Sequence, residues 1–203
     1  MKFKMMVIGI MGLFLLLGCG KKEAQPEMKS SKNKSEVKDP HNFDHHQGMM
    51  MIYEAPKTWG KETPSSSMRL DQYRLPGKDG AGDAVMAVFH FPGTGGDVEG
   101  NLNRWYGQFK HEGGKTVKDK AKVEHLEVNG LPVTTTFATG TYLESKSGMM
   151  MGGDVVERPD YAMWAAIAET QDGPWFFKAV GPEKTIKAHM GELNGFVKTF
   201  RAH

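Results

Sequence analysis

The chain has almost no cysteine, and this scarcity excludes stabilisation by disulfide bonds. Cys19 is the only cysteine among 203 residues. A folded domain of this chain must therefore be held together by its hydrophobic core. Residues 49–203 are long enough for such a core, since a domain of that size buries about 70% of the surface of its unfolded chain. We expect one domain there.

The chain also lacks a strong excess of charge of one sign and a long apolar run. Its 26 basic and 24 acidic side chains give a formal net charge of +2, so nothing indicates a nucleic-acid partner. The predominantly apolar stretch 5–17 is short, whereas a membrane-spanning helix needs about 20 residues. Because Lys2 and Lys4 precede it, this stretch is typical of a secretory signal peptide.

The sequence also lacks recognisable catalytic motifs. The glycine-rich turn 93–96 precedes a helical pattern, but it matches neither a phosphate loop nor a dinucleotide-binding fingerprint. The Gly-x-Ser-x-Gly pattern of serine hydrolases is missing as well. His90 lies in an apolar run, where we expect a hydrogen-bonded core histidine. The sequence predicts no catalytic residue and no cofactor, and an enzyme with an unrecognised site remains an alternative.

The N-terminal region carries the most specific signal that is present. Leu-Leu-Gly-Cys at 16–19 resembles the lipobox of bacterial lipoproteins. The resemblance implies removal of residues 1–18 and attachment of acyl chains such as palmitate to Cys19. More than one acyl chain gives stable anchoring in a membrane. Gly20 in place of Asp implies, by the enterobacterial sorting rule, a location in the outer membrane facing the periplasm.

Residues 19–48 are polar, mixed in charge and without apolar periodicity, which predicts a disordered linker. The linker contains His41, His45 and His46, and methionines follow at 49–51. Imidazole and thioether groups bind copper, and imidazole also suits zinc. One interpretation is a periplasmic metal-handling protein, and the other is a solvated histidine patch.

The first half of the domain centres on one strand and one helix. Residues 84–91 are apolar at seven of eight positions, which predicts a strand covered on both faces. Two earlier strands are expected at 49–53 and 68–75. Asp97 is a good N-cap for a helix with an apolar stripe. The stripe consists of Val98, Leu102, Trp105 and Phe109.

The second half of the domain predicts two hairpins and a final helix. The first hairpin pairs 123–128 with 131–142 through Asn129-Gly130, which tolerates the positive φ angles of a type I′ turn. The second pairs 161–169 with 175–180. The last helix begins at Pro182, and its stripe is Ile186, Met190, Leu193, Val197 and Phe200. This order predicts an α+β fold with a largely antiparallel β-sheet and two helices packed on it.

Residues 143–160 form the longest stretch of the domain without periodicity, and loops of that length are usually functional or disordered. Met149, Met150 and Met151 stand there between glycines. Methionine adapts to irregular partner surfaces, so these three side chains are candidates for a partner-binding edge. The alternative is that the loop lies across the sheet and buries them.

Four segments resemble those of a family of uncharacterised bacterial lipoproteins and exported proteins. They are Trp59 with Pro-Ser-Ser-Ser-Met-Arg at 64–69, Asn-Leu-Asn-Arg-Trp-Tyr-Gly-Gln-Phe at 101–109, Gly-Thr-Tyr at 140–142, and Gly-Pro-Trp-Phe-Phe-Lys at 173–178 with Gly-Pro-Glu-Lys-Thr at 181–185. The family brings no known reaction. The element order is also loosely similar to the PsbP/Mog1-like sandwich of noncatalytic assembly and binding proteins. We therefore expect a noncatalytic, membrane-anchored domain that binds a protein or another envelope component.

Overall fold

The computed structural model of the protein describes residues 51–111, 113, 115–145 and 154–203. Three groups of predicted site residues lie outside these ranges and stay predictions. They are the lipidated Cys19, the histidines His41, His45 and His46, and the methionines Met149, Met150 and Met151. The described helices include none that is long and apolar enough to cross a membrane.

A seven-stranded sheet forms the centre of the domain, and every neighbouring pair in it is antiparallel. Its strand order is β2-β3-β4-β8-β7-β6-β5. The strands are β2 (Gly60–Glu62), β3 (Asp71–Leu75), β4 (Ala84–His90), β5 (Lys122–Val128), β6 (Leu131–Ser145), β7 (Val155–Thr170) and β8 (Gly173–Pro182). The predicted α+β class with a largely antiparallel sheet is confirmed.

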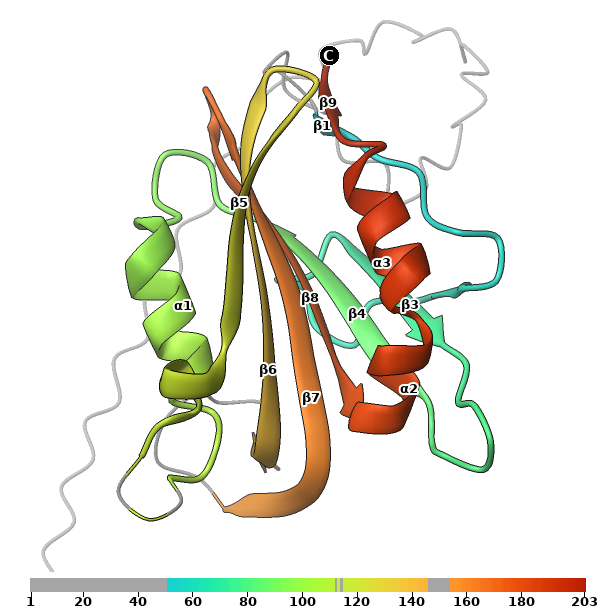
Figure 1. Ribbon diagram of the computed structural model, residues 1–203. Helices are drawn as coiled ribbons and strands as arrows, with labels where there is room; N and C mark the ends of the chain where they lie inside the picture. The colour runs from blue at the N-terminus through green and yellow to red at the C-terminus, as the bar shows by residue number, and fades with distance from the viewer. Residues whose placement is uncertain (1–50, 112, 114, 146–153) are drawn as a thin grey trace, which may run out of the picture. The chain divides into compact units, whose positions relative to one another are not determined.

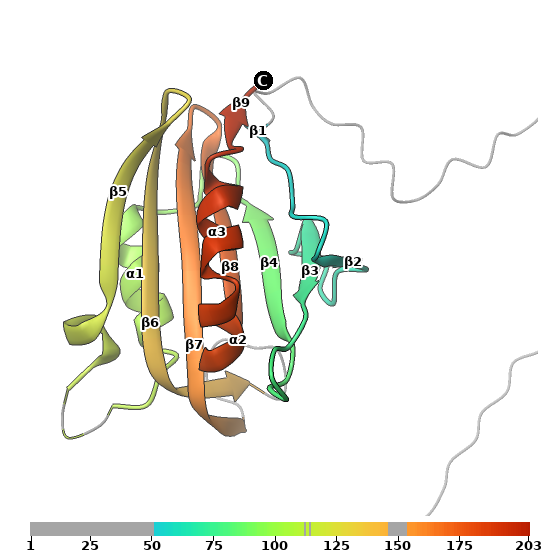
Figure 2. The same cartoon turned by 45° about the vertical axis from the view of Figure 1, so that its right-hand side comes forward.

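Helices cover both faces of this sheet (Figure 1). Helix α1 (Val98–Tyr106) lies on one face, whereas α2 (Glu183–Ala188) and α3 (Met190–Val197) follow each other along the other face (Figure 2). A short 3₁₀ helix, η1 (Val117–Lys120), precedes β5. Each face has its own cluster of buried apolar side chains, so the domain has three layers and two cores.

Several local predictions are confirmed. The side chain of Asp97 accepts a hydrogen bond from the Gly100 amide at 2.8 Å, as an N-cap does. Asn129 and Gly130 have φ angles of 50° and 80°, as the type I′ turn between β5 and β6 requires. Strand β4 is buried on both faces, because Met86 belongs to the core under α2 and α3 while Ala87 on the α1 face is also buried.

The final helix is not continuous, contrary to the prediction. Pro182 is the N-cap residue before α2, and the helix breaks at His189, where φ and ψ are −90° and 2°. The predicted apolar stripe survives this break, since Leu193 and Phe200 beyond it are as fully buried as Ile186 before it.

The prediction of a loop over 143–160 is wrong at both ends. Strand β6 extends to Ser145 and β7 begins at Val155. This part of the hairpin is joined by polar pairs, such as the 2.7 Å ion pair between Arg158 Nη2 and Glu144 Oε2. The end of β6 and the start of β7 therefore lack the alternation of apolar and polar residues from which a strand is predicted.

Other strand boundaries also differ from prediction. The strand expected at 49–53 is β1 (Met51–Ile52), which pairs with β9 (Arg201–Ala202) in a separate ribbon instead of joining the sheet. Strand β3 begins at Asp71 rather than at Met68. Strands β2 and β9 were not expected, because two or three residues are too few to show a period.

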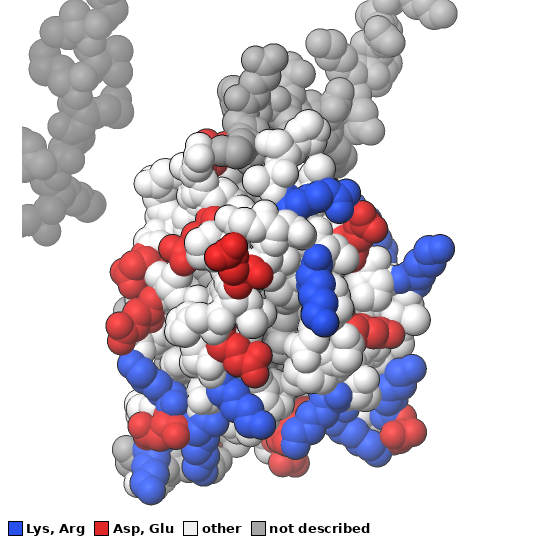
Figure 3. All heavy atoms as spheres, turned by 45° about the horizontal axis from the view of Figure 1, so that its top comes forward, with Lys and Arg blue, Asp and Glu red and all other residues white. Residues whose placement is uncertain are grey.

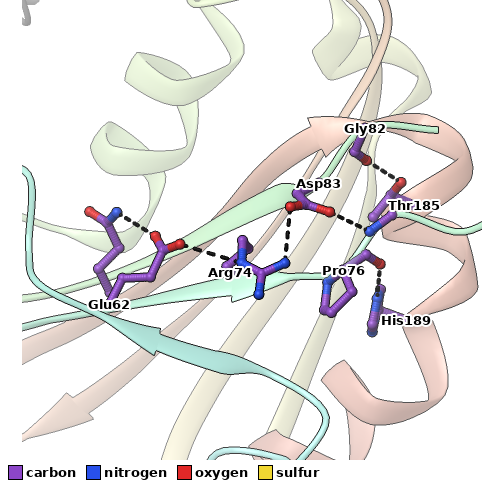
Figure 4. A network of polar contacts seen from close by, with 9 residues as sticks. Glu62, Arg74, Pro76, Gly82, Asp83, Thr185 and His189 are labelled. Carbon is purple, nitrogen blue, oxygen red and sulfur yellow. Dashed lines mark hydrogen bonds and ion pairs between the residues drawn. The ribbon is translucent and has the colours of Figure 1, made fainter.

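Hydrogen bonds connect the loop between β3 and β4 to α2 and to His189, which lies between α2 and α3 (Figure 4). His189 Nε2 lies 2.8 Å from the Pro76 carbonyl oxygen, and Thr185 Oγ1 donates to the Gly82 carbonyl at 2.7 Å. The Asp83 carboxylate accepts from the Gly77 amide at 2.7 Å. The loop is thereby fixed at both of its ends, and with it the start of β4.

Glu192 on α3 contacts His189, with 2.7 Å between Oε2 and Nδ1, and its ionisation makes the stability of this region depend on pH. Burial raises the pKa of its carboxyl, but hydrogen bonds from His189, Thr58 and Trp59 outweigh burial and hold the pKa below its usual value. A carboxylate with a lowered pKa stabilises the fold above its ordinary pKa of about 4.3 and loses this effect as the pH falls through the lowered value.

We therefore expect Glu192→Gln to lower the thermal midpoint at pH 7. The gap in thermal midpoint to the wild type should narrow as the pH falls from the ordinary carboxyl pKa of about 4.3 through the lowered pKa of Glu192, because the wild-type carboxyl then becomes protonated. Thermal unfolding of both proteins across this pH range measures the gap. A gap of constant size would mean that ionisation of Glu192 does not contribute to stability.

Candidate functional site: a cation cluster beside α1

One lysine lies at the centre of the sheet on the face that α1 covers. Lys178 is in β8, the fourth strand of seven, and its cross-strand neighbours are Ala87 on β4 and Ala165 on β7. Both neighbours are small, so the long side chain of Lys178 has room above the sheet. Charged side chains are rarely placed between apolar neighbours without a partner or a function.

Aromatic rings and one amide surround the Lys178 amine. Its Nζ lies 5.9 Å from the ring centre of Trp105 on α1 and 5.6 Å from that of Tyr142 on β6. Both distances are within the range of cation–π attraction. The amine donates a hydrogen bond to Gln108 Oε1, which also accepts from the Tyr142 hydroxyl at 3.4 Å.

The amide of Asn101 holds the first of two nearby arginines. Arg104 Nη2 donates to Asn101 Oδ1 at 2.6 Å. Asn101 is itself fixed, because its Nδ2 donates to the carbonyl oxygens of Gly95 and Asp97 at 2.8 Å each. The Gly95 carbonyl of the glycine-rich turn thus helps to fix Asn101, and Asn101 in turn holds the guanidinium of Arg104.

The second arginine stands at the end of a polar row along β2 and β3. Arg69 Nη1 donates to Gln72 Oε1 at 2.6 Å, and Gln72 Nε2 donates to Glu62 Oε2 at 3.0 Å. Glu62 also lies 3.5 Å from Arg74 Nε, which continues the row (Figure 4). The row fixes Gln72, and Gln72 in turn fixes the guanidinium of Arg69.

We call Lys178, Arg104 and Arg69 the cation cluster. Burial, and then the positive charges of Arg104 and Arg69, lower the pKa of Lys178 to about 7. Arg69 also acts on Tyr142, although burial of that hydroxyl and the charge of Glu144 outweigh it and raise the pKa of Tyr142. Strongly shifted ionisable groups gather at functional sites.

Within the described residues, no carboxylate forms an ion pair with any member of the cation cluster. Other cations do have such partners: Lys61 pairs with Asp71 and Lys110 with Glu157, each at 2.8 Å. The face shown in Figure 3 carries both acidic and basic side chains. The cation cluster therefore departs from the usual charge pairing of this domain.

Two guanidiniums and one amine without a described acidic partner can bind an anion. Guanidinium binds carboxylate and phosphate oxygens through paired hydrogen bonds, and lysine adds a point charge. Lys178 and Arg69 are half-buried, which strengthens their contacts because less water screens them, whereas Arg104 is exposed. The arrangement fits an oxyanion, and its amine can also act as a nucleophile once it has lost its proton.

None of the residues of the cation cluster was predicted as a site residue, although the sequence contains signals for them. The site draws on four short segments of the sequence: Arg69 comes from 64–69, Trp105 and Gln108 from 101–109, Tyr142 from 140–142, and Lys178 from 173–178. Trp105 was assigned to the core, and it is indeed 3% exposed. The lysine inside the apolar strand of the last segment was the clearest overlooked signal.

Among the described residues, two histidines that the sequence makes candidates, His90 and His125, have other surroundings. The ring of His90 stacks on Trp175 with centres 4.4 Å apart, and its Nε2 has no hydrogen-bond partner in the described part of the chain. Burial lowers the pKa of His90. His125 on β5 contacts Thr134 Oγ1 through Nδ1 at 3.0 Å. Over the described ranges, His, Cys, Asp and Glu form no group that could hold a metal ion.

Comparisons with known proteins give little guidance. No family model matches the chain, and no curated protein matches it. One similar solved structure is PA94 from Pseudomonas aeruginosa, a protein of unknown function with 10% sequence identity. The match covers 77% of this chain and 85% of that one, with a TM-score of 0.43. A likeness of this size supports no inference about function, which must come from the site itself.

Proposed function

We propose that this protein is a bacterial lipoprotein of the cell envelope whose noncatalytic domain binds an oxyanion, a carboxylate or phosphate group, on a partner or envelope component. The observation that carries the proposal is the cation cluster without a described carboxylate partner. The lipobox-like segment ending at Cys19 supports the anchoring part of the proposal. The polar linker supports a domain held away from the membrane surface.

The energetics of Lys178 favour a binding role over a structural one. Burying a lysine costs stability unless a counter-charge compensates it, and here the two charged groups that act on the pKa of Lys178 are both cations. A bound oxyanion would supply the missing negative charge. Proteins keep such a costly arrangement where binding needs it, and stability often rises when it is removed.

We expect Lys178→Met to weaken oxyanion binding by about tenfold or more, because a charge-assisted hydrogen bond contributes about 1.5 to 3 kcal/mol. The same change should leave the thermal midpoint unchanged or raise it, since methionine keeps the chain length and removes the half-buried charge. Calorimetric titration of full-length protein in detergent with inorganic phosphate and with acetate measures the affinity.

Lys120→Met is the matched control, because Lys120 is exposed at the end of η1 and the change removes the same charge. The control should bind both anions as the wild type does. Equal weakening in both variants would show a nonspecific charge effect, and no oxyanion binding by the wild type would refute the proposal.

For anchoring, we expect Cys19→Ala to abolish acylation and to leave an unprocessed precursor or a protein outside the membrane fraction. The reason is that the cysteine thiol is the proposed lipid attachment point and the only thiol in the chain. Metabolic labelling with an alkyne fatty acid, followed by membrane fractionation, tests this. Continued labelling of the Cys19→Ala protein would end the lipoprotein assignment.

A further inference from the structure

We propose that the free edge of β5 is the interface of a homodimer, in which β5 pairs antiparallel with β5 of a second copy of this chain. Strand β5 is the outer strand of the seven-stranded sheet, next to β6 (Figure 2). The pairing joins the sheets of the two copies into one. This inference goes beyond the proposed function, because it uses no residue of the cation cluster.

Strand β5 is long and exposed for an edge strand. Its seven residues are all exposed except Val128, which is half-buried. Val123 and Leu126 are large apolar residues, yet they are 41% and 40% exposed. Proteins usually protect an edge with a short strand, a proline, a bulge or a covering element. The opposite edge strand, β2, has three residues, whereas β5 contains no proline and pairs with β6 in an unbroken register.

Charged side chains can also protect an edge, but those of β5 have both signs. Lys122, Glu124 and Glu127 form no ion pair within the part of the chain that the structure describes. His125 contacts Thr134 Oγ1 through Nδ1 at 3.0 Å, which leaves Nε2 as a donor for a carboxylate. The strand thus carries both halves of an imidazole–carboxylate pair, at His125 and Glu127.

The hairpin with β6 decides which backbone groups of β5 face the open edge. A two-residue turn is closed by a hydrogen-bonded pair, here Val128 with Leu131. Since such pairs alternate along an antiparallel ladder, Leu126 is also bonded to β6. The amides and carbonyls of His125 and Glu127 therefore face the open edge, where a second strand must bond to them.

Symmetry restricts how two copies of β5 can pair. Two antiparallel copies in one sheet are related by a two-fold axis perpendicular to the sheet, so each face continues into the same face of the second copy. Val123 and His125 line a hollow together with α1. Lys122 and Glu124 line another together with α2 and α3. Odd-numbered residues of β5 must therefore lie opposite odd-numbered ones, and even-numbered residues opposite even-numbered ones.

One of the allowed registers joins complementary side chains. With the axis at Leu126, His125 lies opposite Glu127 of the second copy, and the symmetry repeats this pair. Each of the two pairs exchanges two backbone hydrogen bonds. The two Leu126 side chains lie opposite each other at the centre, where they cover apolar surface that is exposed in one copy alone. Apolar and opposite-charge cross-strand pairs both stabilise a sheet.

The other registers lack this match. An axis at Glu124 or at Glu127 sets two carboxylates opposite each other, which is unfavourable. An axis at His125 sets two imidazoles opposite each other. An axis at Val123 needs extended backbone ahead of Lys122, where η1 is a 3₁₀ helix.

The test introduces a cysteine at the axis. Leu126→Cys is made in full-length Cys19→Ala protein, where the new thiol is the only one. Opposite residues of a non-hydrogen-bonded pair have Cα atoms about 4.5 Å apart, within the range of about 4.4 to 6.8 Å that a disulfide spans. In detergent with a glutathione redox buffer, we expect a disulfide-linked dimer on a non-reducing gel.

Glu124→Cys in the same Cys19→Ala protein is the matched control, because position 124 is exposed and lies on the same face of β5. Its thiol would face Val128 of the second copy, and the two thiols would be about 13 Å apart along the strands, too far for a disulfide. We expect at least about tenfold less dimer than from Leu126→Cys. Equal yields, or no dimer from Leu126→Cys, would overturn the inference and leave the edge to a strand of a different protein.

An exchange of charges tests the register. His125→Glu sets two carboxylates opposite each other in each pair and should lower the dimer yield of Leu126→Cys by about threefold or more. Adding Glu127→Lys restores opposite charges with their order reversed and should recover the yield. A yield that His125→Glu does not change, or that Glu127→Lys lowers further, would contradict the proposed pairing.

Discussion

Replacing Trp105 by alanine should lower the free energy of unfolding by about 3 to 5 kcal/mol, which is the usual cost of emptying a buried aromatic site. Trp105 is 3% exposed and meets Phe176 edge to face, with ring centres 5.9 Å apart. It belongs to the core cluster between α1 and the sheet. A loss of this size is a large part of the 5 to 15 kcal/mol that typically stabilises a domain.

Urea titration followed by circular dichroism measures this loss. Met68→Ala is the control, because Met68 is 58% exposed and its truncation should change stability by less than about 0.5 kcal/mol. A loss below about 1 kcal/mol for Trp105→Ala would show that α1 does not depend on this side chain.

Gly181→Ala should be the second strongly destabilising change. A Cβ at position 181 would lie 2.4 Å from the Cβ and 2.6 Å from the Cα of Ala84. One of these contacts is with backbone, so β8 and β4 must move apart. Overpacking of this kind costs about 1 to 3 kcal/mol and sometimes more.

Gly191→Ala is the matched control for this change, because a Cβ there meets nothing within 4 Å. Gly191 lies in α3, where alanine is a better helix former, so the control should gain up to about 1 kcal/mol. Parallel denaturant curves compare the two variants. Equal changes in the free energy of unfolding for Gly181→Ala and Gly191→Ala would mean that the close approach of β4 and β8 does not affect stability.

The features that could be predicted from the sequence are those with a local period. The apolar run of β4, the stripe of α1 and the Asn129-Gly130 hairpin each follow from neighbouring residues alone. The break at His189 does not, because its imidazole contacts Pro76, 113 positions away. The extended hairpin beyond position 142 was missed because pairs such as Arg158 with Glu144 hold it together.

The cation cluster could not be assembled from the sequence for a related reason. Arg69 precedes β3, Arg104 is in α1 and Lys178 is in β8, and only the sheet order brings them together. Lys178 alone gave a local signal, as a charged residue within an apolar strand. That signal says that a partner or a function is needed, but it does not say which residues provide it.

The pairing of β4 with β8 also sets the time course of folding. Val85 and Val180 become neighbours although about 95 positions separate them. Closing so long a loop has an entropic cost before any contact compensates it, and folding rates fall as such nonlocal contacts increase. The pairing of β4 with β8 must wait until β8 has been synthesised, so a nascent chain that ends before β8 lacks the pair that joins the two halves of the sheet.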